Sequence, residues 1–110
     1  MTTRHKYPVR WARVAEQDLE AILDYIALDS VDAALQVLMK LRDRAATLST
    51  TPLRGRVVPE LQAQGVMSYR ELIVKPWRIV YRESQQHVQV LAVLDSRRNL
   101  EDILLERFGR

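Results

Sequence analysis

The sequence predicts an α+β fold, in which an N-terminal helix hairpin packs on a small antiparallel sheet. Two stretches of helical periodicity lie in the first half of the chain and are separated by a short turn. Three strand-like runs and a final helical stretch follow in the second half. A chain of 110 residues fits one domain. We therefore expect a single domain over residues 1–110, with the element order β-α-α-β-β-β(-α).

The first half begins with a short strand and continues into two helices. Residues 7–11 are predicted to form a strand whose side chains point alternately to its two faces. Pro8 suits the edge of a sheet because it donates no backbone hydrogen bond. A helix is predicted over residues 12–28, where one apolar stripe contains Leu19, Ile22, Leu23 and Ile26. A second helix is predicted to extend to about residue 49, with Ser30 available as its N-cap. Its stripe contains Ala34, Leu38, Leu41, Ala45 and Leu48. Because the connection between these two helices is short, they are predicted to pack as an antiparallel hairpin.

The second half is predicted to be mostly strand. Residues 53–68 contain Gly55, Pro59 and Gly65 and are interpreted as a loop. Three strands should follow as a meander, over residues 69–75, 77–82 and 87–94, with a tight turn at Pro76. The last of these runs is nearly all apolar, as expected for a central strand covered on both faces. A short helix should end the chain over residues 99–108, with Asn99 as a candidate N-cap.

Composition limits the chemistry that the chain can perform. The sequence is 47% hydrophobic and 28% charged, which is ordinary for a globular domain. It contains no cysteine, which excludes disulfides and thiolate catalysis. No group of acidic residues and histidines has metal-ligand spacing, so we expect neither a metal nor a cofactor. Since no signal core or membrane-spanning stretch is present, we expect a cytoplasmic protein.

The positive charge is concentrated in the strand region. Between residues 69 and 98, six Lys or Arg stand against three Asp or Glu, which equals the whole net charge of +3. Such clustering favours an acidic partner, such as nucleic acid or an acidic protein. The alternative is that these charges only solvate a strand edge and deter aggregation.

Strand alternation predicts where these charges point. Arg78 and Arg82 should share one face of their strand, whereas Trp77, Ile79 and Tyr81 should meet the helix hairpin on the other. We expect four arginines to converge on the face or rim away from the hairpin: Arg70, Arg78, Arg97 and Arg98. On this interpretation Arg78→Ala leaves folding nearly untouched.

Five segments resemble one protein family. They are LRGRVVPE at residues 53–60, YRELIV at 69–74, WRIVYR at 77–82, VLAVL at 90–94 and RRNL at 97–100. Together they resemble the RelE/ParE superfamily, the toxins of bacterial type II toxin–antitoxin modules. The resemblance implies growth inhibition, plasmid stabilization and a cognate antitoxin that forms a hetero-oligomer with the toxin.

The superfamily contains two activities, and both stay open. RelE-type members cut mRNA on the ribosome, whereas ParE-type members inhibit DNA gyrase without known bond chemistry. RelE-type enzymes commonly carry a tyrosine or histidine near the C-terminus, and the residues after Arg98 contain neither. The ParE-type interpretation is therefore favoured, with no catalytic residues expected. A third possibility is an inactive relative that only binds antitoxin.

The resemblance also suggests site residues. Contacts to the target would come from Arg70, Arg78, Arg82, Arg97 and Arg98. Contacts to the antitoxin would come from Leu23, Ile26, Arg78 and Arg97, with acidic antitoxin residues masking the arginines. If the chain were a nuclease, the candidates would be Arg78, Arg97, Arg98, Tyr69 and Glu71, since cleavage needs cations and proton-transfer groups. A carboxylate at the start of a strand, however, is usually solvated. His5 lies in the N-terminal tail and His87 beside a turn, and neither is expected to face the basic surface of the sheet.

Overall fold

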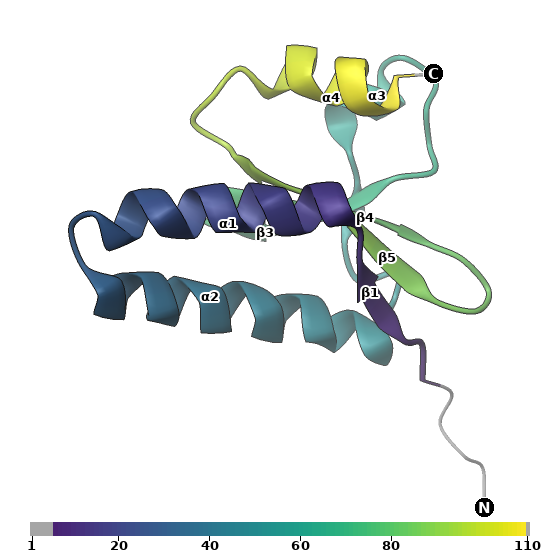
Figure 1. Cartoon of the computed structure of the whole chain (residues 1–110). Coiled ribbons are helices and arrows are strands. Elements are labelled where there is room, and N and C mark those ends of the chain that lie inside the picture. Colours follow the sequence, from purple (N-terminus) through teal and green to yellow (C-terminus); the bar gives the residue numbers. More distant parts are fainter. Residues whose placement is uncertain (1–5, 110) are drawn as a thin grey trace, which may run out of the picture.

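The computed structural model describes residues 6–109 and contains a five-stranded sheet with helices against it (Figure 1). The elements follow the order β1 (Val9–Trp11), α1 (Arg13–Ala27), α2 (Val31–Ala46), the 3-10 turn η1 (Thr47–Ser49), β2 (Arg56–Val57), α3 (Pro59–Gln62), β3 (Arg70–Val74), β4 (Trp77–Glu83), β5 (Val88–Asp95) and α4 (Leu100–Phe108). The predicted α+β class and element order are confirmed. Within residues 6–109, no helix is long and apolar enough to cross a membrane.

The strands are arranged in the order β1-β5-β4-β3-β2, so β1 and β2 form the edges. The predicted meander of β3, β4 and β5 is antiparallel throughout. The sheet is mostly antiparallel, as expected, and β1 is the exception because it pairs with β5 in parallel. The direction of β1 is set by α1, because α1 follows it directly and packs on β5.

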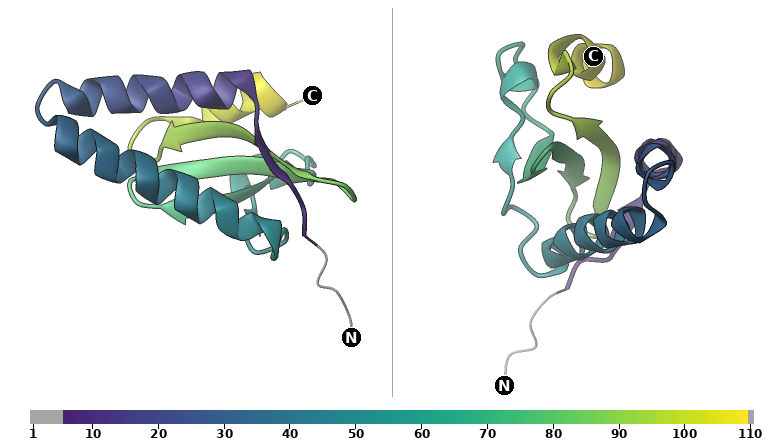
Figure 2. Two further views of the ribbon diagram at one scale, coloured as in Figure 1. Left: turned by 60° about the horizontal axis from the view of Figure 1, so that its bottom comes forward. Right: turned by 90° about the vertical axis from the view of Figure 1, so that its left-hand side faces the viewer.

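The helix hairpin covers one face of the sheet, as Figure 2 shows. Trp77, Ile79 and Tyr81 of β4 belong to one buried cluster with Leu19 of α1 and Leu41 of α2. The alternation predicted for β4 is therefore confirmed. Each fully buried apolar side chain of this kind contributes about 1.5–3 kcal/mol. This cluster is therefore the main source of hydrophobic stability.

The opposite face of the sheet carries a second, smaller core. Val80 and Ala92 pack there with Leu61 of α3 and Leu104 of α4, and Figure 1 shows α3 beside α4, away from α2. The prediction that residues 53–68 form a loop is wrong, because β2 and α3 lie within this segment. These elements have two and four residues, which is too short to show a hydrophobic period.

Helix capping agrees with the sequence at one terminus and differs at another. The Ser30 side chain accepts a hydrogen bond of 3.1 Å from the backbone N–H of Ala33, so the predicted cap of α2 is confirmed. Asn99 occupies the N-cap position of α4 but makes no capping hydrogen bond. Its side-chain amide instead donates to Asp102 at 3.2 Å. Asn99 therefore lies at the predicted N-cap position, but its side chain does not cap the helix.

Tyr81 anchors the segment that leads into β2. Its hydroxyl is buried and accepts a hydrogen bond of 2.9 Å from the backbone N–H of Gly55. A Cβ atom at position 55 would lie 2.5 Å from the carbonyl oxygen of Glu71, so this close approach requires glycine. The Arg70 guanidinium donates to the Gly55 carbonyl at 2.8 Å. These contacts place β2 at the edge of the sheet, beside β3, and lead the chain to α3 on the second face.

Candidate functional site

Arg78 belongs to an ion-pair cluster of four side chains, called here the Glu71 cluster: Arg56, Glu60, Glu71 and Arg78. The Nη1 atom of Arg78 lies 2.9 Å from Glu60 Oε1 and 3.2 Å from Glu71 Oε1. The second oxygen of Glu71 accepts from Arg56 Nε at 2.8 Å. The Glu71 side chain has no exposed surface. Both oxygens of this buried carboxylate are therefore paired with arginine.

The charges in this cluster stabilise one another. The hydrogen bond from Arg78 lowers the pKa of Glu60 below its ordinary value of 4.5, although burial opposes this shift. The same bond raises the pKa of Arg78. Two arginines and two carboxylates leave no net charge, so Arg78 is not a free cation. The expectations that Glu71 is solvated and that Arg78 can be removed without affecting folding no longer hold.

The structure does not bring the four predicted arginines together. Arg70 is the cross-strand neighbour of Tyr81, whose side chain lies in the hairpin-facing core. Directly paired residues on adjacent strands share a face, so the expectation that Arg70 lies beside Arg78 is wrong. Arg82 is exposed at the far end of β4. Arg97 and Arg98 lie in the turn between β5 and α4.

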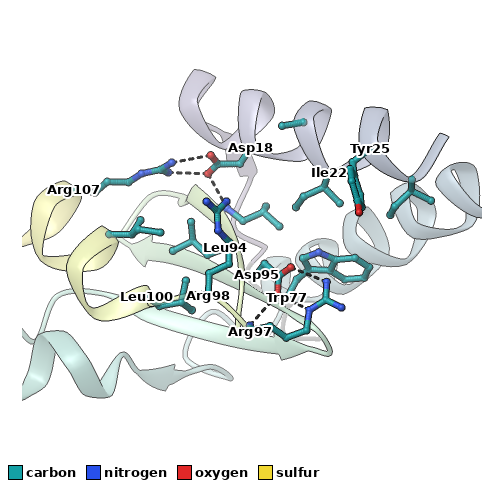
Figure 3. A pocket seen from close by; sticks show the side chains of 14 residues that line it. Asp18, Ile22, Tyr25, Trp77, Leu94, Asp95, Arg97, Arg98, Leu100 and Arg107 are labelled. Atoms are coloured by element: carbon teal, nitrogen blue, oxygen red, sulfur yellow. Dashed lines mark hydrogen bonds and ion pairs between the residues drawn. The ribbon is translucent and has the colours of Figure 1, made fainter. Parts of the chain in front are cut away.

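A pocket of about 480 Å³ lies between α1, the end of β5 and α4 (Figure 3). Apolar side chains from α1, β4, β5 and α4 contribute to its wall, among them Ile22, Trp77 and Ile103. Arginines are also part of its lining: Arg97, Arg98 and Arg107. The pocket therefore combines an apolar interior with positive charge, which suits an amphipathic, acidic ligand.

Two ion pairs border the pocket. Arg107 of α4 donates to both oxygens of Asp18 on α1, at 2.8 and 2.9 Å, and this pairing raises the pKa of Arg107. Asp18 also accepts from the backbone N–H of Val93 at 3.1 Å, which ties α1 and α4 to β5. Arg97 pairs with Asp95 at 2.9 and 2.7 Å, which lowers the pKa of Asp95.

Arg98 differs from its neighbours in the pocket. It is exposed, and its side chain makes no ion pair or hydrogen bond within residues 6–109. Its backbone N–H donates to the carbonyl of Asp95 at 3.1 Å, so the position of its backbone is defined. Arg98 is therefore the cation of this pocket that is available to an acidic partner.

The sequence matches the family described as the ParE toxin of the type II toxin–antitoxin system parDE, over residues 9–100. The chain belongs to the ParE toxin family. A chain of the chromosomal ParDE system from P. aeruginosa is 24% identical, with a TM-score of 0.69 over 83% of this chain and 97% of that one. A chain of the RelBE2 toxin–antitoxin complex from Mycobacterium tuberculosis is 22% identical, with a TM-score of 0.54 over 86% and 97%. These two likenesses show a shared fold. Among curated proteins, none matches significantly.

The remaining candidates of this ParE-family toxin are distributed over the fold. Ile26 and Arg97 line the pocket, whereas Leu23 packs against the hairpin core. The Tyr69 ring lies 4.8 Å from that of Phe108, within the layer formed by α3 and α4. His87 contacts Ser84 in the turn between β4 and β5, and His5 lies outside the described residues. No group of three metal-ligating side chains occurs among residues 6–109.

Sequence reasoning missed several lining residues of the pocket, including Asp18, Tyr25, Trp77 and Arg107. They come from α1, β4 and α4, and no spacing in the sequence connects them. The one usable signal was the pair Arg97 and Arg98 at the end of an apolar strand. This pair indicated where in the sequence the pocket lies, but not which other residues line it.

Arg78→Ala should lower the free energy of unfolding by about 3 kcal/mol, because it leaves the buried Glu71 carboxylate with Arg56 as its one partner. Urea denaturation followed by circular dichroism measures this change. Arg98→Ala is the matched control and should change stability by no more than about 0.5 kcal/mol. Equal stability of the two variants would contradict a structural role for Arg78.

Glu60→Gln should destabilise the protein in a pH-dependent way. The pKa of Glu60 is lowered in the folded state, so its stabilising effect is present above 4.5 and is lost as the pH falls through the folded-state pKa. The difference in unfolding free energy between wild type and Glu60→Gln should therefore be largest near neutral pH and fade in acid. Glu20→Gln, at an exposed position of α1, serves as the control. A difference that does not change with pH would refute this assignment.

Proposed function

We propose that this ParE-family toxin inhibits DNA gyrase in the cytoplasm, without cleaving bonds itself, and is neutralised by a cognate antitoxin. The most direct support is that charges are paired on the sheet face where a nuclease would need free cations. Arg78 on that face is paired with Glu60 and Glu71. Because its charge is already balanced, it is poorly suited to stabilise a pentavalent phosphate.

The surroundings of Arg78 also argue against RNA cleavage. A nuclease needs a base for the 2′-hydroxyl and an acid for the leaving oxygen. Of the sequence candidates for these roles, Glu71 is buried between two arginines and Tyr69 packs against Phe108. The apolar layer of α3 and α4 covers Val80 on the same face. Neither candidate is therefore well placed to transfer a proton to or from RNA.

The turn between β5 and α4 supplies the accessible cations instead. The Arg97 side chain is 72% exposed although it pairs with Asp95, and Arg98 has no ion-pair partner among the described residues. Guanidinium groups bind carboxylates and phosphates in a planar, bidentate way. We assign contact with the gyrase–DNA complex to this turn, with Arg82 as a more distant contributor.

The pocket beside this turn suits the antitoxin. An amphipathic segment could insert an apolar side chain between Ile22, Trp77 and Ile103 and place a carboxylate on Arg98. This segment would then cover Arg97 and Arg98, so that they could not contact the target. Neutralisation would follow from direct masking, in a hetero-oligomer of toxin and antitoxin.

The purified chain should inhibit supercoiling of relaxed plasmid by gyrase and leave ribosome-bound mRNA intact. The double variant Arg97→Ala/Arg98→Ala should lose this inhibition while retaining the circular dichroism spectrum of the wild type. Cleaved mRNA with normal supercoiling would favour the RelE-type activity. No effect in either assay would favour an inactive relative that only binds antitoxin.

Antitoxin binding should depend on the charge of Arg98. Arg98→Glu should weaken binding of the antitoxin encoded beside this gene by at least about tenfold, because a carboxylate of the antitoxin would face another carboxylate. Isothermal titration calorimetry measures the affinity. Arg82→Glu, which reverses an exposed charge on β4, should bind normally. Equal affinities for both variants would exclude the pocket as the antitoxin site.

A further inference from the structure

A stripe of exposed apolar side chains runs along α2. Val31, Leu35 and Met39 are 63%, 53% and 64% exposed, and Leu28 in the preceding turn is 86% exposed. Residues four positions apart lie on the same side of a helix, so these side chains are continuous over about two turns. The side chain of Leu41, by contrast, is fully buried against the sheet. The helix therefore presents a second apolar side that the chain itself does not cover.

A row of polar residues lies beside this stripe, each one position after an apolar residue: Asp32, Gln36 and Lys40. All three are exposed. Neither Asp32 nor Lys40 has an ion-pair partner within residues 6–109. The row begins with a negative charge and ends with a positive one, with an amide midway. Such a row complements itself when a second helix runs in the opposite direction.

We propose that the exposed side of α2 binds a second copy of this chain, with the two α2 helices antiparallel about a two-fold axis near Leu35 and Gln36. In this arrangement Val31 meets Met39 of the second copy, and the two Leu35 side chains lie near the axis. Asp32 faces Lys40 of the second copy, and the same pair forms again on the other side of the axis. A two-fold contact uses the same patch on both subunits, as this pattern requires.

The order of the charges beside the stripe favours a second copy over an acidic antitoxin segment as the occupant. Residues 13–46 contain seven Asp or Glu against four Lys or Arg, so an acidic segment would be repelled there. The pairing of Asp32 with Lys40 does not depend on that net charge, because it is local and reciprocal. An isolated apolar stripe would bind partners without selection, whereas these flanking charges set the direction of the second helix.

The contact is small, and a weak dimer is therefore expected. Stable interfaces bury about 800 Å² on each partner, and three exposed side chains on one helix with one more in the preceding turn provide less. We expect a dissociation constant on the order of 100 μM. The inference does not depend on the proposed function, because the antitoxin pocket lies between α1 and α4. Two toxins can associate through α2 while each pocket stays accessible.

Cross-linking tests the geometry directly, because the chain contains no cysteine of its own. Gln36→Cys places a thiol near the two-fold axis, and a short bifunctional maleimide should convert this variant rapidly to a covalent dimer. Gln85→Cys, exposed in the turn between β4 and β5, is the matched control and should remain mostly monomeric. Equal cross-linking rates for the two variants would overturn the proposal.

Sedimentation velocity over a range of concentrations gives an independent test. The wild-type chain should form dimers as its concentration rises, and Leu35→Asp should abolish them, whereas Leu53→Asp, at another exposed leucine, should not. Asp32→Lys and Lys40→Asp should each weaken association several-fold, and the double swap should restore it. A chain that stays monomeric, or a Leu35→Asp variant that dimerises normally, would refute the contact. Loss of antitoxin binding by Leu35→Asp, with no dimer in the wild type, would assign the surface to the antitoxin instead.

Discussion

Glu71 is a carboxylate without exposed side-chain surface, held between the guanidinium groups of Arg56 and Arg78. A buried charge is costly unless it is paired and hydrogen-bonded. The segment after α2 must therefore fold back onto the sheet, because Arg56 and Glu60 come from β2 and α3. The close approach of Gly55 to Tyr81 makes this return possible. The placement of the second layer of the protein depends on this set of contacts.

The position of α3 also affects the pocket. Leu61 of α3 and Leu104 of α4 pack on the same sheet face, so the position of one short helix influences the other. Helix α4 in turn brings Arg107 to Asp18 on α1, which joins the two layers at the border of the pocket. A charge cluster on one side of the sheet thus helps to position the lining of a pocket at its end.

The arginines of this chain have two different physical roles. Arg78 and Arg56 compensate a buried carboxylate, and Arg107 holds α4 against α1. Arg98 makes no such contact within the described residues. A count of positive charge cannot separate these roles, because both give the same sequence signal. For a ParE-family toxin this separation is informative, because only arginines that the fold itself does not use are available to a partner.

The sequence by itself determined the elements whose pattern is local. Helices α1 and α2 show the 3.6-residue period, and β4 shows the two-residue alternation that directs Ile79 and Tyr81 to the hairpin. Only the tertiary structure decided the burial of Glu71, the parallel pairing of β1, the existence of α3 and the walls of the pocket. Arg56 and Glu71 are 15 residues apart, and Asp18 and Arg107 are 89 apart. Such contacts depend on how distant segments meet, and a periodic pattern carries information about neighbouring residues alone.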